Sequence, residues 1–314
     1  MCIEYRDLYS LLNTQYSNLN LHMANLKEVR NRITSVTSTQ QITKAMKMVS
    51  AAKLKRATNA IVQLRPYANK LRDILAQVSS SVEGSDSPYT QDRVPTKVLV
   101  VVITSNRGLA GAFNANVIKA TNNLIFSKYA EQHARGNLSI VAIGKRGHDF
   151  FTKRGFDVIG NNNELFNNLN FENVSKVTEY IMNEFKESNI DRVEVVYNQF
   201  QNAAVQILTS EQLLPLVPEE KEDNVAELDY IIEPSKEKII EELIPKAIKI
   251  QLYKAVLDSN ASEHGARMTA MDKATDNAGD LLKALKLSYN QARQAAITTE
   301  LTEIVSGAAA LSNG

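Results

Sequence analysis

Tryptophan is absent from this sequence of 314 residues, cysteine occurs once, and glycine and aromatic residues are scarce. Only 12 glycines, 11 tyrosines and 9 phenylalanines are present, which is few for two compact domains of about 150 residues each and favours long helices. The single Cys2 excludes a disulfide framework and a cysteine-based zinc site. The sequence has no run of about 18 apolar residues, so it predicts no membrane-spanning helix. Residues 1–22 match neither a signal peptide nor a transit peptide.

The formal net charge is +1, but charge of each sign is segregated along the chain. Residues 25–72 contain 11 basic residues and one acidic residue, a net +10. Residues 211–245 contain 11 acidic residues and three lysines, a net −8. Such segregation indicates surfaces that meet different partners. The basic segment could neutralise phosphates, but it lacks interleaved aromatic residues between Leu26 and Pro66, and we expect no nucleic-acid partner.

Apolar residues at alternating spacings of four and three predict long helices at both ends of the chain. The N-terminal pattern starts apolar and then falls on two polar residues, Gln40 and Thr43. Its positions are Leu26, Val29, Ile33, Val36, Gln40 and Thr43, and later Ala57, Ile61, Leu64, Ala68, Leu71, Leu75 and Val78. The C-terminal pattern, which never slips, consists of His264, Met268, Met271, Thr275, Ala278, Leu282, Leu285, Tyr289, Ala292, Ala296 and Thr299.

Strand and helix patterns alternate between these segments, after a linker at residues 81–95. The β-branched run Lys97–Thr104 is typical of a strand buried on both faces. Further strands are expected at Leu138–Ile143, Phe156–Ile159, Arg192–Phe200 and Val205–Thr209, and helices at Phe113–Gln132, Lys145–Lys153 and Val174–Lys186. This order predicts a Rossmann-like α/β domain with a largely parallel sheet over residues 96–210. An acidic linker at 211–235 follows.

The terminal segments are too long to be covered by such a domain. As helices, residues 24–80 and 236–308 would measure roughly 85 Å and roughly 110 Å, whereas the domain would be about 30–35 Å across. One helix enters the domain and the other leaves it, so they can pair only as antiparallel partners. We therefore expect the α/β fold class, with a long antiparallel coiled coil of helices at 23–80 and 236–314. A helix pair of this length is poorly buried alone and indicates a partner protein.

The best candidate for chemistry is the glycine turn, Thr104–Asn114, between a buried strand and a helix. A glycine turn in this place can hold a phosphate at a helix N-terminus, but the full phosphate-binding motifs are missing, and we favour a tight connection. The four histidines are scattered and lack the spacing of metal ligands. His264 lies on a helical seam, where packing is the expected role. We predict no catalysis by this chain, no cofactor and no metal site.

Three separated parts of the sequence, in the right order, resemble the gamma subunit of F-type rotary ATP synthases. The N-terminal part comprises Met23–Ile33 and Thr39–Lys53, and the C-terminal parts comprise Glu263–Met271 with Ala274–Ala278, and Ala292–Ala310. The glycine turn also fits this family. The resemblance extends from Met23 to about Ala310, almost the whole chain.

The resemblance implies a non-catalytic central-stalk rotor that transmits torque between a proton-driven membrane ring and a catalytic hexamer. The implied partners are the alpha and beta subunits of the hexamer, the epsilon subunit and the membrane c-subunit ring, with one copy of this chain per complex. The implied location is the cytoplasmic face of the bacterial inner membrane, as a peripheral part of the ATP synthase.

The resemblance also implies roles for individual residues. Arg293, Gln294 and Thr298 match positions that hydrogen-bond the catch loop of a beta subunit. Met46, flanked by Lys44 and Lys47, matches a shaft position close to a lever of the beta subunit. Tyr230 and Glu233 match residues of the foot, which meets the ring, although Ile232 stands where the family commonly has an aromatic residue.

The start of the chain is a second departure from the family pattern. Its members usually begin at the position of Met23, so residues 1–22 are an extension or a misassigned start, and we favour the misassigned start.

Two alternative functions remain open from the residues alone. One is a phosphate-binding α/β enzyme with coiled-coil arms that uses Gly108 and Gly111, and the other is an adaptor coiled coil that forms a homodimer.

Overall fold

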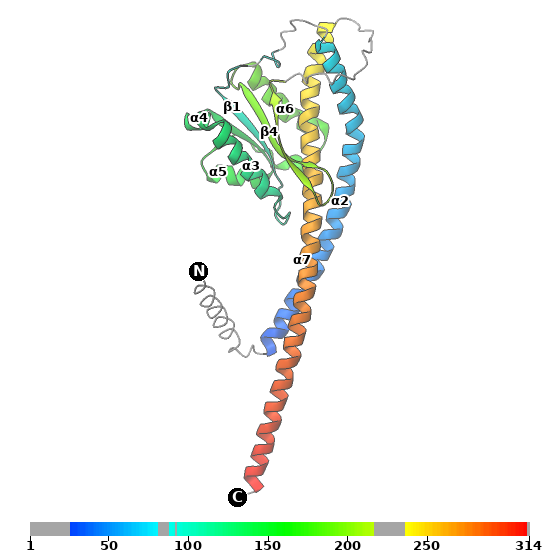
Figure 1. Ribbon diagram of the computed structural model, residues 1–314, viewed down its shortest axis with the longest axis vertical. Helices are drawn as coiled ribbons and strands as arrows, with labels where there is room; N and C mark the ends of the chain where they lie inside the picture. Colours follow the sequence, from blue (N-terminus) through cyan, green and yellow to red (C-terminus); the bar gives the residue numbers. More distant parts are fainter. Residues whose placement is uncertain (1–25, 81–87, 92, 217–235, 313–314) are drawn as a thin grey trace, which may run out of the picture. The chain divides into compact units, whose positions relative to one another are not determined.

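A computed structural model of the chain describes residues 26–80, 88–91, 93–216 and 236–312 (Figure 1). The chain divides into two compact units. The first comprises the segments up to Ala45 and from Asp272 onward, and the second comprises Met46–Met271. All strands of the described chain belong to the second unit.

A five-stranded sheet forms the centre of the second unit. Its strands are β1 (Val98–Ile103), β2 (Leu138–Ile143), β3 (Asp157–Val158), β4 (Arg192–Phe200) and β5 (Gln206–Leu214). The strand order is β3-β2-β1-β4-β5, and all neighbours are parallel except β4 and β5. The predicted Rossmann-like sheet is therefore confirmed.

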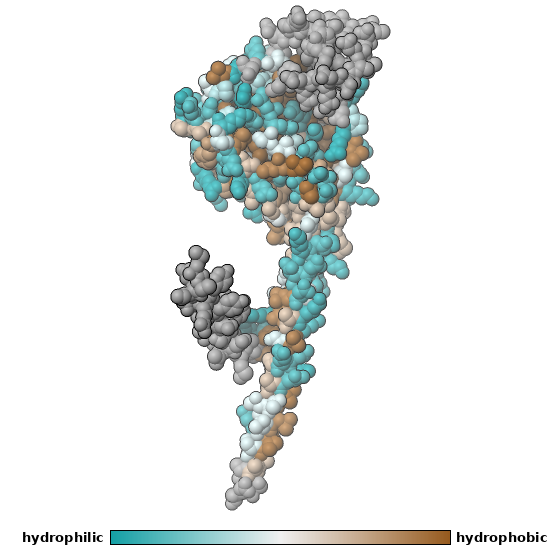
Figure 2. All heavy atoms as spheres, viewed as in Figure 1, coloured by the Kyte–Doolittle hydropathy of each residue, from teal (hydrophilic) through white to brown (hydrophobic). Residues whose placement is uncertain are grey.

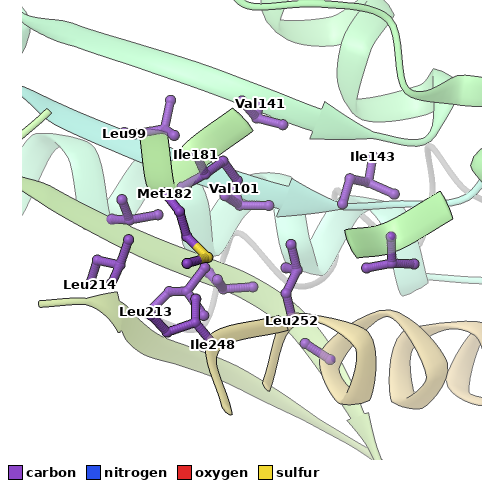
Figure 3. Packing of buried hydrophobic residues seen from close by; sticks show 14 of the residues in the cluster. Leu99, Val101, Val141, Ile143, Ile181, Met182, Leu213, Leu214, Ile248 and Leu252 are labelled. Atoms are coloured by element: carbon purple, nitrogen blue, oxygen red, sulfur yellow. The ribbon is translucent and has the colours of Figure 1, made fainter. Parts of the chain in front are cut away.

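Helices cover both faces of this sheet. The helices of the second unit that lie between strands are α3 (Phe113–Lys128), α4 (Ala130–Ala134), α5 (Lys145–Lys153) and α6 (Phe171–Lys186). In β1, alternate side chains enter different cores, because successive residues of a strand point to opposite faces. Val98, Val100 and Val102 pack with residues of α3 and α5. Leu99, Val101 and Ile103 pack with residues of α6 and α7 (Figure 3).

Two long helices, α2 (Leu26–Ser80) and α7 (Lys236–Ser312), enclose the α/β part in the sequence. At 55 and 77 residues, they measure about 80 Å and about 115 Å along their axes. In the second unit they share a small apolar core, in which Ala57 and Ile61 of α2 pack with Leu257 and Ala261 of α7. Lys246 of α7 lies over the ring of Tyr67, whereas Glu263, further along α7, is close to Lys53, which comes earlier on α2. The pairing is therefore antiparallel, as predicted.

The predicted seams are confirmed by burial at every position whose side chain is described, except Thr299. Positions 26, 29, 33, 36, 40 and 43 of α2 are buried or half-buried, and so are 57, 61, 64, 68 and 71. The same holds on α7 at every predicted position from His264 to Ala296, whereas Thr299 is exposed. The four-three spacing thus identifies the face of each helix that is covered.

Several predicted bounds differ from the structure by one to three residues, and two differ by more. The helix expected at Phe113–Gln132 is interrupted at Tyr129, which has φ −125° and separates α3 from α4. The buried Tyr129 hydroxyl donates a hydrogen bond to Glu194 Oε1 at 2.6 Å, a contact that local periodicity does not reveal. The last strand, expected to end at Thr209, extends to Leu214. The first four residues assigned to the acidic linker therefore belong to the sheet, and Leu213 and Leu214 are fully buried.

Candidate functional surfaces of the long helices and the glycine turn

The end of α7 exposes a row of aliphatic side chains, here called the tip stripe. It consists of Ile297, Leu301, Ile304, Val305 and Leu311, which are 51%, 57%, 71%, 59% and 87% exposed. Spacings of four and three keep most of these residues on one face of the helix. Figure 2 shows hydrophobic atoms along this end of α7. Nothing in the described part of the chain buries the stripe, and an apolar surface of this kind marks an interaction site.

The three polar residues predicted to contact a catch loop lie beside the tip stripe. Arg293, Gln294 and Thr298 are all exposed. Thr298 lies one turn after Gln294, and its hydroxyl donates to the Gln294 carbonyl oxygen at 2.9 Å. Arg293 lies one turn before Ile297 of the stripe. A guanidinium, a carboxamide and a hydroxyl, presented together on an exposed helix, can form hydrogen bonds with a partner.

The predicted shaft residues occupy neighbouring positions on α2. Lys44 is exposed, whereas Met46 and Lys47 are half-buried. Near them, α2 exposes the aliphatic side chains of Ile42 and Val49, each more than half accessible. This helix therefore offers apolar and basic groups together. The predicted foot residues, Tyr230 and Glu233, lie outside the described residues.

The glycine turn is held by side chains from several elements. Asn114 Oδ1 of α3 accepts a hydrogen bond from the Ser105 backbone N–H at 2.9 Å. Arg267 of α7 donates through Nη2 to the carbonyl oxygens of Arg107 at 3.3 Å and Gly108 at 3.4 Å. Gly111 has φ +56°, a conformation that glycine adopts without strain. The turn is therefore held against α7 by the Arg267 side chain. This arrangement favours a tight connection between strand and helix over a phosphate-binding site.

A buried ion pair on α7 supports the contact with the turn. Glu263 Oε1 accepts from Arg267 Nη1 at 2.6 Å, and both side chains are 10% exposed. Burial raises the pKa of Glu263 despite the neighbouring Arg267. For His264, burial, with the nearby charges of Arg267 and Lys53, lowers the pKa to about 4. His264 is therefore neutral at physiological pH and packs on the seam, as predicted from its position.

A metal site and a membrane-spanning helix are both absent from the described residues. No three of their His, Cys, Asp or Glu side chains gather as a possible metal site. None of their helices is long and apolar enough to cross a membrane.

Sequence reasoning predicted the polar trio but missed the tip stripe. The signal was present, because Ile297, Leu301 and Ile304 repeat the spacing of four and three just after the covered seam ends. It was hidden because the stripe is out of phase with the seam, since Ile297 follows Ala296 by one residue and Leu301 follows Thr299 by two. The burial of Glu263 and Arg267 was also missed, although an acid four residues before a base on a helix is a recognisable pair.

The fold and these surfaces define a protein whose two long helices expose apolar and polar side chains and whose α/β domain lies between them in sequence. Among solved structures, the chain is similar to one from the Euglena gracilis mitochondrial ATP synthase, described as OSCP/F1/c-ring in rotational state 3, with TM-score 0.65 and 21% identity over 91% of this chain and 94% of that chain. A second similar chain comes from the central stalk/c-ring of the Tetrahymena thermophila mitochondrial ATP synthase, with TM-score 0.53 and 23% identity over 74% of this chain and 99% of that chain. At these identities, the likeness concerns the fold.

Sequence comparison gives the family. The profile of the family described as ATP synthase matches residues 25–311. The ATP synthase gamma chain of Cytophaga hutchinsonii is 55% identical over 295 residues, which cover 93% of this chain and 100% of the relative. That of Flavobacterium psychrophilum is 56% identical over 290 residues, covering 92% and 99%. The chain therefore belongs to the family of ATP synthase gamma chains, which are non-catalytic subunits of that complex.

Proposed function

We propose that this chain is the rotor of the central stalk of an ATP synthase and transmits torque between a proton-driven membrane ring and the catalytic hexamer. Proton flow is thereby coupled to the synthesis or hydrolysis of ATP on partner subunits. The observation that carries the proposal is the tip stripe together with the adjacent Arg293, Gln294 and Thr298. The end of α7 lacks cover from the described chain but carries apolar and hydrogen-bonding groups suited to a protein partner.

The partners in this proposal are the alpha and beta subunits of the hexamer, the epsilon subunit and the ring of c subunits, with one copy of this chain per complex. Arg293, Gln294 and Thr298 would bond a catch loop of a beta subunit, and Met46, Lys44 and Lys47 would meet another part of the hexamer. Tyr230 and Glu233 would meet the ring or the epsilon subunit. The complex would lie on the cytoplasmic side of the bacterial inner membrane.

The energetics of the ion gradient require a mechanical connection of this kind. One charge that crosses 100 mV provides only about 2.3 kcal/mol, so several translocations must be combined before one ATP can form. A continuous helix such as α7 can transmit their combined effect, because backbone hydrogen bonds connect its successive turns, apart from the one that Pro245 cannot donate.

Affinity purification of the tagged full chain from its native membranes tests the role in the complex. Alpha, beta and this chain should be recovered in a ratio of about 3:3:1, together with epsilon and ring subunits. A preparation in which the chain purifies alone or as a homodimer would contradict the proposal. Loss of nucleotide binding by the isolated chain on substitution of Gly108 and Gly111 would instead support the enzyme alternative.

Substitutions in the assembled complex test the polar contacts. The double variant Arg293→Ala, Gln294→Ala should reduce ATP-driven proton pumping several-fold, because its hydrogen bonds to the partner are lost, while the melting temperature of the isolated chain stays within about 1 °C of wild type. Lys286→Ala, an exposed residue two turns earlier on α7, is the matched control and should leave pumping unchanged. Equal pumping by the double variant and the control would remove Arg293 and Gln294 from the mechanism.

A further inference from the structure

The face of α7 that packs on the sheet changes from apolar to polar along the helix. Ile248, Leu252 and Ala255 belong to the main core of the α/β part. Ser259 follows Leu252 by seven residues and Ser262 follows Ala255 by seven, so the two serines continue the same face of the helix. They are only 1% and 0% exposed. The sheet-facing side of α7 therefore carries two buried hydroxyl groups where the apolar face ends.

Asp258 adds a buried carboxylate beside these serines. It lies four residues before Ser262, and Ser259 lies three residues before it, spacings that place Cβ atoms about 5–6 Å apart on one helix. Asp258 Oδ1 and the Oγ atoms of both serines have no hydrogen-bond partner among the described residues. We call these three atoms the oxygen cluster. Because buried polar atoms are nearly always hydrogen-bonded, the cluster calls for a ligand that forms hydrogen bonds.

The charges that face the oxygen cluster come from three elements. Lys254 of α7, Arg65 of α2 and Glu211 of β5 all act on the carboxylate of Asp258. Glu211 lies opposite Val195, a residue of the main core, and opposite residues of an antiparallel pair point to the same face of the sheet. The four charged groups sum to zero when Asp258 is ionised, so the surroundings favour a neutral ligand over a cation.

The turn between β4 and β5 covers α7 next to the oxygen cluster. A Cβ atom on Gly265 would lie 3.1 Å from the Ala203 carbonyl oxygen, so this turn lies directly against the backbone of α7. The Thr269 hydroxyl donates a hydrogen bond to the same oxygen at 3.2 Å. Since Gly265 lies three residues after Ser262, this close contact helps to shield the cluster from bulk solvent.

A water molecule has the chemistry that the oxygen cluster needs. It donates two hydrogen bonds and accepts two, whereas the carboxylate accepts and each serine hydroxyl both donates and accepts. Two hydrogen bonds of about 2.8 Å, one on each side of a water oxygen, span the spacing of neighbouring side chains on the helix. Buried waters typically form about three hydrogen bonds to polar groups that would otherwise be unsatisfied, and the cluster provides three such atoms.

We propose that Asp258, Ser259 and Ser262 hold a buried water molecule between α7 and the sheet. The competing explanation is that serine serves here only as a small residue that lets the strands approach the helix. Alanine is smaller still, forms helices better and carries no hydroxyl group that must be satisfied. Two buried serines beside an unpartnered carboxylate oxygen are therefore explained better by a bound water than by their size.

Oxygen-17 magnetic relaxation dispersion of the full chain tests the proposal, because it counts water molecules that stay bound longer than the chain takes to tumble. The double variant Ser259→Ala, Ser262→Ala should lose about one long-lived water, since only one partner remains for it. The control, Ser127→Ala with Thr178→Val, removes two hydroxyls that each donate to a carbonyl oxygen of their own helix. It should keep the wild-type number. An unchanged number in the double variant would overturn the proposal.

Thermal unfolding of the same variants separates the competing explanations. If the serines only provide space, the double variant should melt several degrees higher than wild type, because it loses two unsatisfied hydroxyls and gains helix propensity. With a bound water, its melting temperature should be no higher than that of wild type. A rise of several degrees would therefore count against the water.

The salt dependence of the wild-type melting temperature distinguishes a water from a cation. Equal concentrations of sodium, potassium and choline chloride should give the same value. A rise with one alkali ion that the double variant lacks would show that the oxygen cluster binds a cation and would overturn the water. None of these measurements involves a partner subunit, so each outcome leaves the rotor function untouched.

Discussion

Asp258 of α7 is a buried carboxylic acid whose ionisation opposes folding. Its side chain is 1% exposed, and Oδ1 has no hydrogen-bond partner among the described residues. Burial raises the pKa of Asp258 to about 6. The positive charges of Lys254 on α7 and Arg65 on α2 act against this rise, and the acid Glu211 on β5 adds to it. Above pH 6 the second unit therefore contains a buried carboxylate that is incompletely compensated.

The difference between the folded and unfolded pKa values sets the size of the effect. The unfolded value is close to 4, so a folded value about 2 higher corresponds to about 3 kcal/mol at pH above 6. The sign follows from proton binding. Between pH 4 and pH 6 the folded chain binds more protons than the unfolded chain, so the contribution of Asp258 to stability falls as the pH rises. Below pH 4 both states are protonated and this contribution is constant.

The substitution Asp258→Asn removes the ionisable group with little change in shape. We expect the free energy of unfolding to rise by about 1–3 kcal/mol at pH 7.5 and the gain to shrink toward zero near pH 4. Urea unfolding of the full chain at several pH values, followed by the near-UV circular dichroism of its tyrosines, measures this difference. The control is Asp280→Asn, because Asp280 is exposed on α7 and pairs only with the exposed Lys283 in the described chain. A variant less stable than wild type by the same amount at every pH would refute the reasoning.

Two further substitutions probe how the second unit is held together, and both are measured by urea unfolding. Arg267→Ala should lower the free energy of unfolding by about 3–5 kcal/mol, because it leaves Glu263 buried without its cation, and a loss below 1 kcal/mol would contradict this. Gly144→Ala should cost about 3 kcal/mol or more, since its Cβ would lie 2.1 Å from the Thr104 carbonyl oxygen. Gly155→Ala, which shares a positive φ but has nothing within 4 Å, should cost only about 1–2 kcal/mol, and equal losses at the two glycines would rule out the steric cause.

Periodicity alone was sufficient to predict the long helices, their covered faces and most strands. A helix face repeats every three or four residues and a strand face every two, so these signals are local in the sequence. The strands at Leu138–Ile143 and Arg192–Phe200 and the helix at Lys145–Lys153 have the predicted bounds. The break at Tyr129 was not predictable, because it accompanies a contact with Glu194, which lies 65 residues further along the chain.

The candidate site was predictable only as residue types on a helix. The sequence places Arg293, Gln294 and Thr298 close together, but their exposure depends on which other parts of the chain reach the end of α7. The same limit applies to Asp258. Its burial arises from packing in the second unit and leaves no sign in the local sequence. The charge of Glu211 on β5 adds to the rise in the pKa of Asp258, and the charge of Asp258 in turn contributes to the raised pKa of Tyr197 on β4.

The change in burial along α7 connects its sequence to its function. Near its start, Ile248 and Leu252 belong to the main core of the α/β part. After Met271, only the seam residues Ala278 and Leu282 are buried, and after Ala296 every described side chain is exposed. Apolar residues continue into this last section, although a helix selected only for solubility would replace them with polar ones. Since burial of apolar surface drives association as it drives folding, the exposed end of α7 is explained by a partner that completes its cover.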